Sequence, residues 1–123
     1  MTAPVTIDHC GRTIAASVVA FDIQWTGELP EDREVTWAVR VADPRGDSQV
    51  ELGLRRVGRQ VSQYARDLST GLTQEVRPDA DLDGAEITVR FPTDVVGTAV
   101  EWPTWQAVIE VEGEDLTALT VPV

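Results

Sequence analysis

The chain has 123 residues, with 21 acidic and ten basic side chains and a formal net charge of −11. Its length fits a single domain over residues 1–123 that buries a core without disulfides or metal. The acidic excess excludes nucleic acid and anionic membranes as partners, because both need a concentrated cationic surface. It favours basic partners or a bound cation.

The sequence carries no membrane or secretion pattern. It has no run of about 18 apolar residues, so we expect no membrane insertion. Residues 1–12 lack the apolar segment behind a basic start that marks a secretory leader. We therefore expect a cytoplasmic protein, or one whose leader has been trimmed. Cys10 is the only cysteine, which excludes an internal disulfide, and we expect it to be buried as a small apolar side chain.

The N-terminal part predicts three strands. Residues 5–8 alternate weakly and predict a short edge strand, which residues 9–12 interrupt. The run 13–25 is β-branched and apolar, and in its second half apolar side chains occupy every second position, as in a half-buried strand. The run 35–41 repeats this alternation. The apolar faces of the two long runs comprise Val19, Phe21, Ile23, Trp25, Val35, Trp37, Val39 and Val41.

The connection between the two long runs carries Gly27 and Pro30 and predicts a polar turn. Because this connection is short, we expect the two strands to pair with each other as antiparallel neighbours. Each strand places one tryptophan, Trp25 or Trp37, on its apolar face. A tryptophan in such a position is typical of a core side chain rather than of a ligand platform.

The middle of the chain allows two interpretations. After a turn over 42–47, residues 50–54 alternate, and Gly58 stands where a tight hairpin needs a turn, which predicts a returning strand over 60–66. We prefer this strand because the neighbouring segments are β. The alternative is a helix over 57–69, which would make the fold α+β. The residues that fit its helical spacing are Val57, Val61, Tyr64 and Leu68.

The C-terminal third contains the clearest strand. Apolar and polar side chains alternate over 86–91, and Pro92 ends the strand because proline donates no ladder hydrogen bond. A short strand over 73–76 precedes it, and a single turn is expected over 93–97. Residues 105–111 alternate again and lead through an acidic hairpin turn into a last strand.

Seven to nine short alternating segments separated by turns predict an all-β fold, an antiparallel β-sandwich. The paired cysteines of a true immunoglobulin domain are missing, so only a general immunoglobulin-like sandwich is predicted. An uncovered edge strand of such a sandwich can pair with a second copy of the chain and form a homo-oligomer.

A D-x-D-x-D-G run supplies the metal-site candidate, with Asp79, Asp81 and Asp83 before Gly84. Three carboxylates at alternate positions of a turn can converge on one calcium ion. An EF-hand is excluded, because the twelfth loop position is Arg90 where an acidic ligand is needed, and a strand follows instead of a helix. The run predicts either a solvated acidic turn or a calcium site of another kind.

Trp102, Tyr64 and three arginines are the candidates for a ligand or partner surface. Trp102 stands beside a proline outside the alternation. It either stacks on a sugar or on a side chain of a partner, or it folds over the open end of the sandwich, which we prefer. Tyr64 shares its strand face with polar neighbours. Arg55, Arg56 and Arg59 gather with Arg66 around the predicted hairpin, where the cluster either receives an acidic peptide or phosphate or neutralises the acidic surface.

Two C-terminal segments carry a resemblance. I-T-V-R-F-P at Ile87–Pro92 is followed by T-W-Q-A-V-I-E-V at Thr104–Val111. A strand that ends in proline before a tryptophan-bearing strand and an acidic hairpin resembles small β-sandwich domains of actinobacterial proteins. The resemblance covers about the last third of the chain and implies a fold, without any particular activity.

No pattern in the sequence predicts catalysis. A Ser-His-acid triad would have to use His9, and no nucleophile elbow or phosphate-binding glycine loop exists. We therefore expect a non-catalytic binding or interaction module with a protein partner and no cofactor. The alternative is a calcium- or carbohydrate-binding sandwich that uses Asp79, Asp81 and Asp83 for the ion or Trp102 for the sugar. A small enzyme ranks third.

Overall fold

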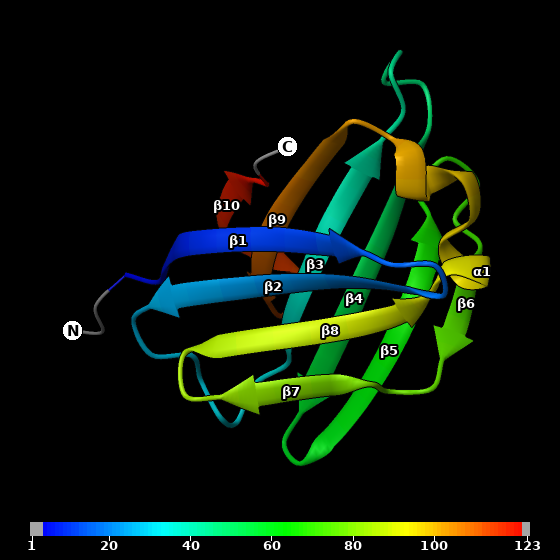
Figure 1. Cartoon of the computed structure of the whole chain (residues 1–123). Helices are drawn as coiled ribbons and strands as arrows, with labels where there is room; N and C mark the ends of the chain where they lie inside the picture. Colours follow the sequence, from blue (N-terminus) through cyan, green and yellow to red (C-terminus); the bar gives the residue numbers. More distant parts are fainter. Residues whose placement is uncertain (1–3, 122–123) are drawn as a thin grey trace.

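The computed structural model describes residues 4–121 and shows two antiparallel sheets packed face to face (Figure 1). The strands of one sheet cross those of the other steeply in this view. The four-stranded sheet has the order β1 (Thr6–Ile14), β2 (Val18–Thr26), β8 (Glu86–Pro92), β7 (Ala80–Asp83). The six-stranded sheet has the order β10 (Glu114–Thr120), β9 (Thr104–Val111), β3 (Val35–Ala42), β4 (Gln49–Val57), β5 (Gln60–Asp67), β6 (Thr73–Val76). The predicted all-β sandwich is confirmed, with ten strands in the described part of the chain.

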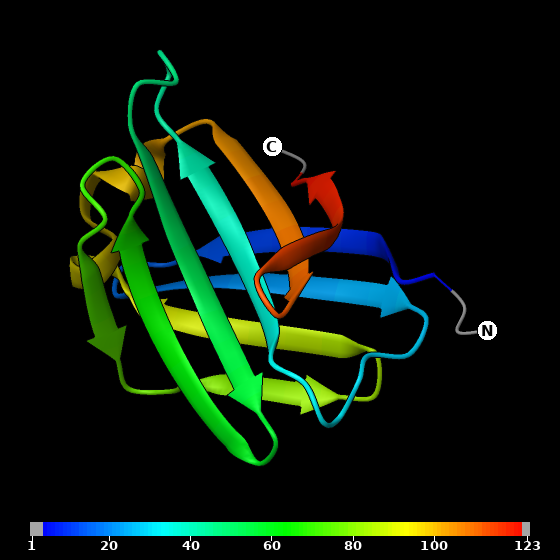
Figure 2. The ribbon, with the colours of Figure 1, turned by 180° about the vertical axis from the view of Figure 1, so that it is seen from behind.

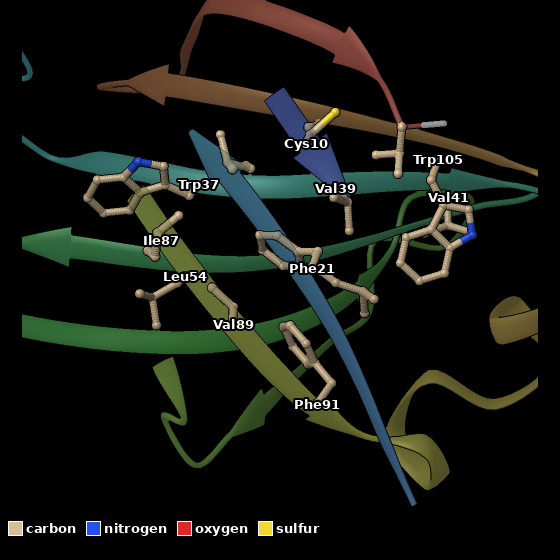
Figure 3. Close-up of a cluster of buried hydrophobic side chains, with 14 of the residues drawn as sticks. Cys10, Phe21, Trp37, Val39, Val41, Leu54, Ile87, Val89, Phe91 and Trp105 are labelled. Carbon is tan, nitrogen blue, oxygen red and sulfur yellow. The ribbon is translucent and has the colours of Figure 1, made fainter. Parts of the chain in front are cut away.

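The alternation read from the sequence produces the core between the sheets. The apolar faces of β2, β3, β8 and β9 point inward, and most of their side chains are completely buried. Phe21 and Phe91 stack with their ring centroids 6.1 Å apart. Figure 3 shows Trp37 at one end of this cluster and Trp105 at the other, with Phe21 between them.

The predicted pairing of β2 with β3 is wrong. β2 pairs with β1 and β8, whereas β3 pairs with β4 and β9, so the two strands belong to different sheets. The connection over 27–34 crosses from one sheet to the other instead of closing a hairpin. Trp25 and Trp37 consequently meet across the core, with ring centroids 5.7 Å apart.

The predicted break at residues 9–12 is also wrong, because β1 runs through it. The strand absorbs the irregularity as a register shift between Ile7 and His9, and Gly11 pairs with Asp22 inside the ladder. The turn lies later, where the Ala15 N–H donates to the Val18 carbonyl at 2.9 Å. A β-bulge of this kind adds a residue without ending the strand.

The helix alternative over 57–69 is overturned. Gly58 adopts a φ of +62° in a tight turn, and β5 returns beside β4 in continuous register from Gln60 to Asp67. The acidic segment differs from the predicted turn, because Ala80–Asp83 forms β7 and the turn itself lies at Gly84 and Ala85. The expected turn after Pro92 forms α1 (Thr93–Val96), followed by the short helix η1 (Gly97–Glu101).

Both sides of the sandwich are closed. On one side β1 and β10 approach each other, and the Ile7 N–H donates to Thr117 Oγ1 at 3.2 Å. Cys10 lies beneath this seam and is 1 % exposed, as expected, and burial raises the pKa of its thiol. On the other side the chain passes directly from β6 to β7, and Gln63 in β5 donates to the Arg90 carbonyl of the opposite sheet at 2.6 Å.

Candidate functional site

A pocket of about 740 Å³ opens at the end of the sandwich where β3 and β8 begin. We call it the end pocket and define it by Trp25, Trp37, Arg56, Leu82 and the segment 27–32. Figure 2 shows this segment passing the β7–β8 turn before the chain enters β3. The pocket exists because the β2–β3 connection crosses between the sheets at this end instead of closing a hairpin.

The strand alternation brings Arg56 into the end pocket. In β4, Leu52 and Leu54 face the core, and Arg56 follows them on the same face. Its guanidinium carbon lies 5.2 Å from the Trp37 ring centroid, a cation–π distance. One Arg56 terminal nitrogen donates to the Pro30 carbonyl at 3.2 Å, which ties the side chain to the crossing segment.

Two buried N–H donors on residues that line the end pocket lack an acceptor within the described part of the chain: Trp37 Nε1 and Arg56 Nε. Both nitrogens are buried, and the whole Trp37 side chain is 0 % exposed. Trp105, which is equally buried at the other end of the core, donates its Nε1–H to the Trp102 carbonyl at 3.0 Å. A buried donor without a partner costs roughly 1–3 kcal/mol, so the two free donors need an explanation.

The rim of the end pocket is acidic. Glu28, Glu31 and Asp32 lie on the crossing segment and are exposed, while Leu29 and Pro30 between them are half-buried. Arg56 is the single basic residue among the described lining residues. The pocket thus combines aromatic and aliphatic walls, two buried donors and a negatively charged entrance.

A second polar feature covers the outer face of the six-stranded sheet. Arg40 bridges three carboxylates: its guanidinium lies 3.1 Å from Glu51, 2.6 Å from Glu110 and 2.9 Å from Asp115. Tyr64 donates its hydroxyl to the second oxygen of Glu51 at 2.7 Å. We call these five residues the outer network. Four of them, Arg40, Glu51, Tyr64 and Glu110, help to line a shallow depression of about 450 Å³.

The outer network shifts the pKa values of its members in opposite directions. Burial, together with the charge of Glu51, raises the pKa of Glu110, whereas the hydrogen bond from Arg40 lowers the pKa of Asp115. Burial and Glu51 raise the pKa of Tyr64 well above its ordinary value. Because Arg40 serves all three carboxylates, the network is internally satisfied and acts as a rigid cover on the sheet.

The predicted arginine cluster is split by the strand geometry. Arg55 and Arg56 are neighbours on β4 and therefore point to opposite faces. Arg55 lies on the outer face, 2.9 Å from Glu34 and 5.5 Å from the Tyr64 ring, while Arg56 lies in the end pocket. Arg59 is exposed at the tip of the hairpin. The structure does not bring the three together into one anion site.

Tyr64 and Trp102 are both less exposed than the side chains of an open ligand-binding surface. Tyr64 is 7 % exposed and its ring covers Gly53 of β4, where an added Cβ would lie 2.6 Å from the ring. Trp102 is half-buried and packs against the core, and its carbonyl accepts hydrogen bonds from Trp105 and Arg12. This packing agrees with a Trp102 that folds over the sandwich end. A role in sugar binding stays a prediction.

The three aspartates lie along one exposed strand edge, and two of them, Asp79 and Asp81, pair with Arg90. Arg90 donates to Asp81 at 2.7 Å and to Asp79 at 3.3 Å, and Asp83 lies at the end of β7. Residues 4–121 contain no group of three or more side chains placed to hold a metal ion. A calcium site here stays a prediction that requires Arg90 to move away.

Sequence reasoning placed Trp25 and Trp37 in the core and missed the pocket beside them. A signal was present in the alternation, because Arg56 follows Val50, Leu52 and Leu54 at a core-facing position. A charged residue in such a position indicates that the core ends there or opens to solvent.

No protein-family model, curated protein or solved structure matches this chain. The described helices are too short to cross a membrane.

Proposed function

We propose that the chain is a non-catalytic binding module that takes its ligand in the end pocket. The observation that carries this proposal is the pair of buried, unpartnered donors on Trp37 and Arg56. Binding sites commonly combine apolar walls with a few placed polar groups. A ligand oxygen that accepts from either donor would supply the acceptor that residues 4–121 do not provide.

The chemistry of the end pocket supports binding rather than catalysis. Its described lining includes carboxylates and one arginine, but no serine, threonine, cysteine, histidine or lysine that could act as a nucleophile beside a base. The perturbed carboxyl of Glu110 belongs to the outer network, where Arg40 holds it. A perturbed pKa there is accounted for by a structural ion network.

A fragment screen followed by NMR tests the proposal. A library of small neutral and charged fragments is added to the protein, and backbone and tryptophan indole signals are recorded. We expect fragments that bind to shift signals of Trp25, Trp37 and the segment 27–32. Arg56→Met should weaken these fragments, whereas Arg55→Met, on the opposite face of the same strand, should not.

Two results would count against this function. Fragments that gather on the outer network and leave the Trp37 signals unmoved would place the binding surface elsewhere. An equal effect of Arg55→Met and Arg56→Met would show that the loss comes from β4 as a whole and not from the end pocket.

A further inference from the structure

We propose that the ligand of the end pocket is a cationic peptide segment: a backbone carbonyl meets the buried donors, an apolar side chain enters the pocket, and basic side chains meet the acidic rim. This inference rests on the proposed function and adds the chemical class of the ligand. Three independent features of the pocket support it, one for each part of such a segment.

The first feature is the demand for an uncharged acceptor. Trp37 Nε1 and Arg56 Nε each need an oxygen. A peptide carbonyl supplies one with two lone pairs, so it can accept from both donors. A free carboxylate is disfavoured in the same place, because it would pass Glu28, Glu31 and Asp32 at the entrance.

The second feature is the apolar wall. Trp25 lies at 7 % exposure beside Trp37, Leu29 is half-buried, and Leu82 is 44 % exposed although it lies on the core-facing side of β7. Leu82 therefore presents apolar surface at the pocket without protein to cover it. A leucine-sized side chain of the ligand would bury this surface.

The third feature is the charge of the rim. Three exposed carboxylates stand against the single Arg56 among the described lining residues, and the whole chain carries a net charge of −11. Such a field attracts cations to the entrance and repels anions. Exposed charges are screened by salt, so this part of the attraction must weaken as ionic strength rises.

The guanidinium of Arg56 lies over the Trp37 ring in the free protein, and binding in the proposed mode requires it to move. Neither Trp37 Nε1 nor Arg56 Nε reaches solvent in this conformation. The guanidinium is held by its position over the Trp37 ring, 5.2 Å from the centroid, and by one hydrogen bond of 3.2 Å to the Pro30 carbonyl. A ligand carbonyl can replace the hydrogen bond from Arg56 to the Pro30 carbonyl. The guanidinium then turns with its Nε–H toward the ligand oxygen.

Three capped tripeptides test the ligand class: acetyl-Lys-Leu-Lys-amide, acetyl-Gln-Leu-Gln-amide and acetyl-Glu-Leu-Glu-amide. Their dissociation constants are measured from the shift of the Trp37 indole signal. At about 10 mM salt, where the Debye length is about 30 Å, we expect the lysine peptide to bind about tenfold more tightly than the glutamine peptide. At about 150 mM salt this ratio should shrink, and the glutamate peptide should be the weakest throughout.

Two variants assign the charge effect to the rim. Replacing Glu28 and Glu31 by glutamine and Asp32 by asparagine should remove the preference for the lysine peptide. Asp47→Asn is the control, because it removes an exposed carboxylate at the far end of β3. It should leave the tenfold ratio nearly unchanged.

The outcomes separate the two proposals. If the glutamine peptide binds at Trp37 as tightly as the lysine peptide, the end pocket is a binding site but the cationic class is wrong. If none of the tripeptides moves the Trp37 signal while fragments do, the peptide class is wrong. If neither peptides nor fragments move it, both proposals fail.

Discussion

At the scale of single residues, Trp37 and Trp105 form a natural comparison. Both are buried at opposite ends of one core, and both carry an indole N–H, but only Trp105 has a described acceptor for it. Comparing the two positions therefore separates the stability that a tryptophan contributes by filling space from the stability that its indole N–H contributes. The volume lost on replacement by phenylalanine is the same at both.

We expect Trp37→Phe to destabilise the fold less than Trp105→Phe does. Both variants lose the same side-chain volume, but Trp37→Phe also removes a donor without a described acceptor, whereas Trp105→Phe removes one of the two hydrogen bonds to the Trp102 carbonyl. The difference in the free energy of unfolding should be about 1–2 kcal/mol. Urea denaturation measures it, and equal losses would contradict a free donor on Trp37. Trp37→Ala should cost about 3–5 kcal/mol through lost packing.

Tyr64 is the only tyrosine, so its ionisation can be followed by near-ultraviolet absorbance without assignment. Burial raises its pKa in the folded state above the ordinary value of about 10. The folded protein therefore holds this proton more tightly than the unfolded chain. The raised pKa therefore contributes to the free energy of unfolding. This contribution is complete below about pH 10 and is lost as the pH rises above that value.

We expect the phenolate signal to appear only together with unfolding, monitored by circular dichroism in the same alkaline titration. In concentrated urea the same side chain should titrate near its ordinary value. Ionisation of Tyr64 near pH 10 in a protein that is still folded would show that the hydroxyl is open to solvent.

Asp81 tests the calcium hypothesis. Its pair with Arg90 is exposed, so Asp81→Asn should cost less than about 1 kcal/mol. We also expect excess calcium to leave the melting temperature of both the wild type and Asp81→Asn unchanged, because Arg90 occupies the space between the aspartates. A calcium-dependent rise of several degrees in the melting temperature of the wild type alone would support a calcium site at these aspartates.

At the scale of elements, the sequence alternation predicted most strands and their buried faces. Val19, Phe21 and Ile23 are buried as expected, because a period of two is a local property of the chain. The pairing of β2 with β3 could not be read in the same way. Which strands become neighbours depends on how the two apolar faces meet across the core, as Trp25 and Trp37 do.

Gly53 shows how closely two neighbouring strands fit. A Cβ at this position would lie 2.6 Å from the Tyr64 ring, which covers the glycine from β5. We expect Gly53→Ala to cost about 1–3 kcal/mol, because the ring must move and its bond to Glu51 weakens. Gly46→Ala is the control, since no atom lies within 4 Å of the added carbon, although its φ of +75° adds about 1 kcal/mol. Equal losses, measured by urea denaturation, would mean that Tyr64 does not rest on Gly53.

At the scale of the whole molecule, closure of the two sides leaves the ends as places for a ligand. β1 meets β10, and the chain joins β6 directly to β7, while β6 and β7 are only four residues long. Such short edge strands offer few backbone hydrogen bonds to a second copy of the chain, so strand pairing between copies stays a prediction. The net charge, visible in the sequence, agrees with the acidic rim of the end pocket.

The end pocket itself was beyond prediction from the sequence. Its walls come from β2, β3, β4 and the β7–β8 turn, which meet only once the connection over 27–34 crosses between the sheets. Arg56 carried the local signal, but grouping it with Arg55 and Arg59 as one cluster ignored that adjacent strand residues face opposite sides.

The indole N–H of Trp37 gives the most direct measurement of the central claim. Its NMR signal is assigned by its loss in Trp37→Phe and followed as acetyl-Lys-Leu-Lys-amide is added, with the Trp105 indole as the internal reference. The end-pocket account predicts that the Trp37 proton moves downfield as it gains an acceptor, while the hydrogen-bonded Trp105 proton stays in place. A Trp37 signal that does not move at saturating peptide, or that moves together with Trp105, would contradict it.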